Sequence, residues 1–163
     1  MRRYRRVWGS RRQQAADRVH ALAVREHRRC LDRMLDSHDA LDRPVRPSAA
    51  VIYHDRALVK AHQAASRRLR RRGGGVALDQ ERLEKETLAY LAARTHWPSR
   101  ALAEVSRRRM DANEASRLGD AHLATEIVHQ IVRVDERADS GDPGLVRELV
   151  AAYYRRWFAA GGA

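Results

Sequence analysis

The sequence predicts an all-α fold, and two observations lead to this prediction. Ala, Arg and Leu dominate the 163 residues, and aromatic residues make up only 6%, a composition that favours helix. Apolar residues also recur at three- and four-residue spacing in several segments, which are separated by breaks containing Pro or Gly. A chain of this length can bury a real core within one domain. We therefore expect a single compact helical domain of about six helices over residues 10–160, preceded by a basic arm over residues 1–9.

The N-terminal residues 1–8, MRRYRRVW, combine four arginines with Tyr4 and Trp8. Such an arm can lie on phosphates while its aromatic rings stack on bases. The alternative is a frayed terminus whose tryptophan docks on the core. Ser10 is the expected N-cap of the first helix, which should extend to about residue 37. His27 falls on the inner face of this helix, four residues from an apolar neighbour on either side.

The second helix is expected to begin at residues 47–48, with Ser48 as N-cap, and to stop at the triple glycine of residues 73–75. Asp55 lies on its predicted core-facing stripe, and His54 shares a face with apolar neighbours. Two inward ionisable groups are costly to bury unless something pairs with them, and a divalent metal ion would do so. Local hydrogen bonds or water at the helix edge are the alternative. The predicted stripe consists of Val51, Asp55, Leu58, His62, Ala65 and Leu69.

Four further helices are expected after the glycines. Asp79 caps a helix over residues 80–96 whose inner side includes His96, and a short helix follows, closed by the arginines at 107–109. Residues 111–114 have the spacing of a capping box and open a helix to about residue 138, with Asp120 on its inner face. Pro143 opens a last amphipathic helix, whose apolar positions are Val146, Leu149, Val150, Tyr153, Trp157 and Phe158.

Charge and cysteine content limit the classes of protein considered. The formal net charge is +12, which predicts attraction to polyanions such as nucleic acid, anionic lipid or phosphorylated small molecules. Cys30 is the only cysteine, so neither an internal disulfide nor a cysteine-based zinc site is expected. No apolar run reaches transmembrane length, and the basic N-terminus is not followed by a signal-peptide core. We therefore expect a cytoplasmic protein without a membrane partner.

Inward ionisable residues are predicted on four helices. They are separated by 27, 42 and 24 residues, distances long enough to place each ligand on a different helix. Carboxylates and imidazoles together suit one or two divalent metal ions. The set consists of His27, the pair His54 and Asp55, His96 and Asp120.

The order of these residues resembles that of the HD-domain superfamily of metal-dependent phosphohydrolases, and in particular the small hydrolases of this type from bacteria. The resemblance covers about residues 24–130. It rests on four short stretches: HRRCLDRM at 27–34, AAVIYHD at 49–55, ARTHW at 93–97 and DAHLA at 120–124. The chain departs from the family pattern at Ala23 and Val24, at residues 60–64, at Trp97 and at His122.

The resemblance implies a helical fold and hydrolysis of a nucleotide or another phosphate ester. It implies that His27, His54, Asp55 and Asp120 hold a divalent ion, which can be Mn, Fe, Mg, Ni or Zn, with His96 serving a second ion. Asp55 would orient the nucleophilic water that the metal activates. Arg56, Arg67 and Arg68 would neutralise the phosphate.

Three readings other than hydrolysis remain open. The departures are compatible with a fold that keeps the primary ligands but lacks activity. The charge fits equally well a basic helical module that binds nucleic acid or a nucleoprotein partner, with its histidines in the core. An interaction subunit that uses its basic faces is a further alternative.

Overall fold

The computed structural model describes residues 2–42, 44–72 and 75–139, together with positions 144, 147, 151 and 155. The fold is all-α, as expected, because the described part of the chain is 87% helix and contains no strand. None of the described helices is long and apolar enough to cross a membrane. The described ranges contain five long helices: α1 (Arg2–Asp39), α2 (Pro47–Arg72), α3 (Gln80–Thr95), α4 (Ser99–Arg117) and α5 (Ala121–Asp139).

The chain divides into two compact units, which we describe separately. The first unit contains residues 1–37 and 53–90, and the second contains residues 38–52 and 91–163. Most of α1, α2 and α3 therefore belongs to the first unit, whereas α4 and α5 belong to the second.

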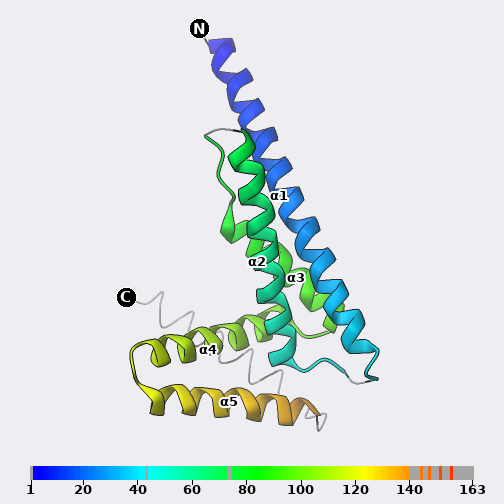
Figure 1. Cartoon of the computed structure of the whole chain (residues 1–163), viewed down its shortest axis with the longest axis vertical. Helices are drawn as coiled ribbons and strands as arrows, with labels where there is room; N and C mark the ends of the chain where they lie inside the picture. The colour runs from blue at the N-terminus through cyan, green and yellow to red at the C-terminus, as the bar shows by residue number, and fades with distance from the viewer. Residues whose placement is uncertain are drawn as a thin grey trace. The chain divides into compact units, whose positions relative to one another are not determined.

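In the first unit, α1, α2 and α3 run alongside one another (Figure 1). Alanines at 57, 61 and 65 recur every four residues on α2 and are at most 1% exposed, so they form one face of the helix. Because alanine is small, another helix can approach this face closely. The core cluster of this unit consists of Val19, Ala23, Val24, Ala61, Ala65 and Leu83.

Polar pairs join α1 to α3 along the length of this unit. Arg82 binds Asp17 at 3.3 Å, and Tyr90 donates a hydrogen bond to Asp32 at 2.7 Å. Between them, His20 Nε2 lies 2.7 Å from Glu86 Oε2, and this hydrogen bond lowers the pKa of Glu86. The partners ascend together in both helices, so α1 and α3 run parallel.

In the second unit, α4 packs on α5 (Figure 1). Leu102 and Val105 of α4 and Ile131 and Val134 of α5 are buried. The carboxylate of Asp135 binds the start of α2, because Ser48 donates to it through its backbone N–H at 3.1 Å and through its hydroxyl.

Three expected helix boundaries differ from the structure. Helical backbone begins at Arg2 rather than at Ser10, because a single glycine within a helix costs only about 1 kcal/mol. Helix α4 continues through the expected break near residue 110 and ends at Arg117. The expected helix over 111–138 is instead interrupted where Gly119 adopts φ +82°, a conformation that favours glycine.

Three other boundaries agree with the sequence. Helix α2 begins at Pro47, as expected. Asp79 caps α3, since Arg82 N–H donates to Asp79 Oδ1 at 3.1 Å. The triple glycine follows the end of α2 at Arg72. The predicted last helix lies outside the described residues, apart from positions 144, 147, 151 and 155, which have helical backbone.

Candidate functional site

A buried pair of histidines links α1 to α2 within the first unit. His27 is 0% exposed and His54 is 5% exposed. His27 Nε2 lies 3.0 Å from His54 Nδ1, and the rings meet edge to face with their centroids 5.0 Å apart. At that distance one ring nitrogen donates a hydrogen bond and the other accepts it. The structure therefore brings together two residues that are 27 positions apart in the sequence.

Burial determines the protonation of this pair. Burial, with smaller contributions from His54 and Arg28, lowers the pKa of His27 to about 3, and burial lowers the pKa of His54 to about 4. Both imidazoles are therefore neutral at pH 7, which is the form that ligates metal ions. No described group hydrogen-bonds to His27 Nδ1, which is buried.

The predicted stripe of α2 agrees only in part with the buried face. Asp55 and His62 were expected to face the core, but both are only partly buried. The buried face contains two members of the predicted stripe, Val51 and Ala65, together with His54 and the alanines at 57 and 61. The phase differs because these small side chains allow close approach of α1, which outweighs the burial of larger residues on the neighbouring stripe.

His96 and Asp120 belong to the second unit, and both are exposed, contrary to the expectation that they point inward. His96 follows the end of α3 with φ +61°, where the chain leaves the helix. Asp120 caps α5, because its Oδ1 accepts a hydrogen bond from Leu123 N–H at 3.0 Å. Each residue therefore has a local role at a helix end.

The predicted metal ligands can be tested against this geometry. Among the described residues, no three His, Cys, Asp or Glu side chains lie close enough to share a metal ion. The histidine pair supplies two nitrogens, whereas zinc sites use three or four protein ligands. The described residues therefore do not complete the site, and the metal ion stays a prediction.

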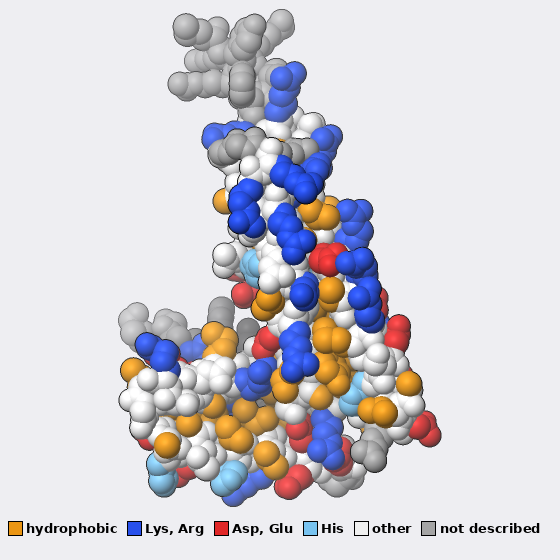
Figure 2. Space-filling model, in the orientation of Figure 1, with side chains coloured by type: hydrophobic (Ala, Val, Ile, Leu, Met, Phe, Trp, Pro, Cys, Tyr) orange, Lys and Arg blue, Asp and Glu red, His pale blue; other side chains and the backbone are white. Residues whose placement is uncertain are grey.

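The surface of the first unit is strongly basic. Its residues include 20 Lys and Arg against 9 Asp and Glu, a net charge of +11. The second unit has 13 basic and 12 acidic residues, a net charge of +1. Nearly all of the net positive charge of the chain therefore belongs to the first unit. Figure 2 shows Lys and Arg side chains gathered along α1 and α2.

Helix α2 contributes a continuous part of this basic surface. Residues 56–72 contain seven basic residues and no acidic one. The predicted phosphate-binding residues Arg56, Arg67 and Arg68 are all exposed. None of them forms an ion pair with a described acidic side chain, unlike Arg82 on α3.

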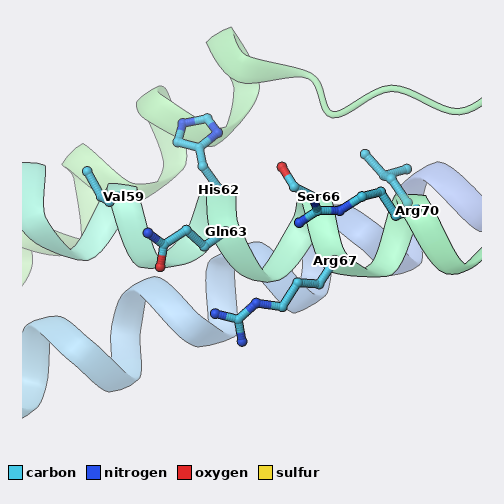
Figure 3. A pocket seen from close by; sticks show the side chains of 7 residues that line it. Val59, His62, Gln63, Ser66, Arg67 and Arg70 are labelled. Atoms are coloured by element: carbon cyan, nitrogen blue, oxygen red, sulfur yellow. The ribbon is translucent and has the colours of Figure 1, made fainter.

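An open hollow lies on the solvent side of α2 (Figure 3). Sequence reasoning missed this feature, although the alanine periodicity of α2 identifies the side that faces away from the core. Its volume is about 800 Å³, and its lining consists of Val59, His62, Gln63, Ser66, Arg67, Leu69 and Arg70.

Comparisons with known proteins add no relative to this description. The chain matches no protein-family model, and searches of curated proteins and of solved structures found no match either.

Proposed function

We propose that this protein binds nucleic acid through the basic surface of its first unit. The observation that carries the proposal is the distribution of charge, +11 in the first unit against +1 in the second. A concentration of Lys and Arg on one part of a protein attracts the phosphate backbone, and counterion release makes the binding depend on salt.

The form of the basic surface favours nucleic acid over the other polyanions. A helix that lies on an anionic membrane needs an exposed apolar face, but the apolar face of α2 is already buried against its neighbours. A small phosphate ester needs cations that converge on one point. The cations of α2 extend instead from Arg56 to Arg71, about 22 Å along a helix, a length suited to a polymer.

A salt titration with matched variants tests this proposal. Arg67, Arg68, Arg70 and Arg71 are replaced together by Gln, and binding to labelled duplex DNA, single-stranded DNA and RNA is measured by fluorescence anisotropy. We expect wild type to bind with an affinity that falls linearly with salt on logarithmic axes. The variant should lose about 0.9 of slope for each of the four arginines that contacts a phosphate of duplex DNA, at most roughly 3–4 in total.

The control replaces four exposed arginines of the second unit by Gln. It makes the same change in net charge, and we expect it to keep the wild-type slope. Equal weakening of both variants would show that overall charge alone drives binding. Absence of binding at low salt would contradict the proposal. The control positions are Arg107, Arg133, Arg147 and Arg155.

A metal-dependent phosphohydrolase is a second candidate, favoured by a specific observation. Of the predicted ligands, His27 and His54 lie 3.0 Å apart, and Asp55 follows directly in the sequence. A metal ion held by these residues would supply an activated water and polarise a phosphoryl oxygen.

Elemental analysis tests this second candidate. Protein purified without chelator should contain about one equivalent of metal, Asp55→Ala should contain little, and His129→Ala, an exposed histidine of the second unit, should match wild type. Metal-dependent release of phosphate from nucleotides would then identify the reaction. No metal in any of the three proteins, even after addition of Mn²⁺, Fe²⁺, Zn²⁺ or Ni²⁺, would contradict it.

A further inference from the structure

The solvent side of α2 presents a row of hydrogen-bonding and apolar side chains between cations. At 100° per residue, Val59, Gln63 and Arg70 lie about 160–200° around the helix from the buried Ala61. Val59 is 53% exposed although it is apolar. We define the α2 outer face as Val59, Gln63, Ser66, Arg67 and Arg70, which all contribute to the hollow shown in Figure 3.

These residue types match the chemical groups on base edges. Gln can pair with the N6 and N7 of adenine, Arg with the O6 and N7 of guanine, and Ser with either kind of edge. An exposed aliphatic side chain such as that of Val59 can contact the methyl group of thymine. Phosphate binding alone would not require Val59, Gln63 or Ser66, because cationic side chains are sufficient to bind the phosphate backbone and contacts with it carry no sequence information.

We propose that α2 enters the major groove of duplex DNA and that its outer face reads the base sequence. This inference rests on the proposed nucleic-acid binding and adds the duplex, the groove and the reading residues. The outer face spans residues 59–70, about 17 Å of helix, and the major groove of B-form DNA is about 12 Å wide, enough to admit an α-helix. The major groove of RNA helices is too narrow for side chains to read, so the inference commits to DNA.

Three further cations of α2 lie to one side of the outer face. Arg56, Lys60 and Arg71 fall about 220–280° around the helix from Ala61, and all three are exposed. Cations beside a reading helix can bind the phosphates that border the groove and so fix its register on the duplex. The arrangement separates residues that position the helix from residues that specify the sequence.

The experiment selects preferred sites for the full-length protein from a pool of random duplexes, followed by binding measurements on the selected site. We expect an enriched site that contains adenine. Gln63→Ala should reduce discrimination between the selected site and its adenine variants by roughly tenfold, without changing the salt slope. Gln130→Ala, an exposed glutamine on α5, serves as the matched control and should retain full discrimination.

Groove choice is measured separately, by protection of guanine N7 from methylation. N7 lies in the major groove, so we expect protection within the selected site. No enriched site, no N7 protection, an unchanged preference in Gln63→Ala, or tighter binding to RNA than to duplex DNA would each overturn the inference. Salt-dependent binding without any of these signs would leave the proposed function intact, whereas absence of all binding would remove both.

Discussion

The two units of this protein differ in their balance of basic and acidic residues. In the second unit, basic and acidic residues are nearly equal in number and lie close together. Arg108 binds the buried Glu104 at 3.2 Å, and Arg117 binds Glu114 at 2.6 Å. In the first unit, 20 basic residues outnumber 9 acidic ones. On α2, seven basic residues follow Asp55 without an acidic one.

This difference separates charged residues that form ion pairs within the fold from the excess of basic residues on which the proposed binding depends. Acidic side chains of α1 and α3 in the first unit are used in pairs between these helices, such as Asp17 with Arg82 and Glu86 with His20. These two carboxylates therefore pair between α1 and α3 rather than with the basic residues of α2. Mutual repulsion along α2 destabilises the free protein, and a polyanion would relieve it.

The cores of the two units should differ less than their surfaces. Leu83 in the first unit and Leu102 in the second are both 0% exposed. We expect Leu83→Ala and Leu102→Ala each to lower the free energy of unfolding by about 2–5 kcal/mol, measured by urea denaturation. Leu123→Ala, at a position 44% exposed, should change it by no more than about 0.5 kcal/mol. A core leucine that behaves like Leu123 would contradict the core assignment.

Buried ionisable groups distinguish the units further. The described part of the second unit buries the carboxylates of Glu104 and Asp135, whereas the first buries imidazoles, including His27 and His54. The pKa of His27 is lowered to about 3 and that of His54 to about 4, from 6.5. The unfolded chain therefore binds more protons than the folded protein between about pH 4 and 6.5. Stability should fall as the pH decreases through this window.

This loss of stability is measured by urea unfolding between pH 7 and pH 5, where most carboxylates stay ionised. A chelator is added so that metal ions do not contribute. We expect up to about 2 kcal/mol from each histidine of the pair. A double variant, His27→Leu with His54→Leu, should lose much of this pH dependence because neither side chain can bind a proton. His129→Leu changes an exposed histidine and should keep it. An unchanged pH dependence in the double variant would contradict burial of the pair.

Local sequence signals predicted the elements of the fold well. Helix content, the cap at Asp79 and the end of α2 at the triple glycine all depend on residues within a few positions of one another. The start of α2 at Pro47 also agrees with the sequence, but the partner of Ser48 could not be predicted in this way. Ser48 binds Asp135, which lies 87 positions further along the chain, and only the folded second unit brings it there.

For the candidate site, local sequence signals predicted less of the structure than they did for the helices. Periodicity correctly placed His27 and His54 inward, but it assigned Asp55 to the core because the stripe containing Val51, Leu58 and Leu69 is the more apolar one. The structure buries Val51, but it also buries the alanines at 57, 61 and 65 and leaves Asp55 only partly buried, so packing density as well as hydrophobicity determines which face is buried. Asp120 was misplaced for another reason: the turn at Gly119 makes it a helix cap rather than an inward residue.

The smallest expected effects concern the carboxylates of α5 that bind the residues beside the start of α2. Asp135 is 8% exposed and accepts two hydrogen bonds from Ser48, while Asp139 pairs with Arg46 at the surface. We expect Asp135→Ala to lower the free energy of unfolding by about 1–3 kcal/mol, since it leaves donors at the helix start without an acceptor. Asp139→Ala, which removes an exposed ion pair, should lower it by no more than about 1 kcal/mol.

Asp135→Asn refines this prediction, because an amide retains one acceptor oxygen but loses the negative charge at the N-terminus of α2. Charge at a helix N-terminus contributes about 0.3–1 kcal/mol, so the Asn variant should lie between wild type and Asp135→Ala. If Asp135→Ala and Asp139→Ala lowered the free energy of unfolding equally, the contact of Asp135 with Ser48 would contribute no more than an ordinary surface ion pair. The order Ala, Asn, wild type would instead show that the second unit stabilises the start of α2, the helix whose later turns carry the basic surface.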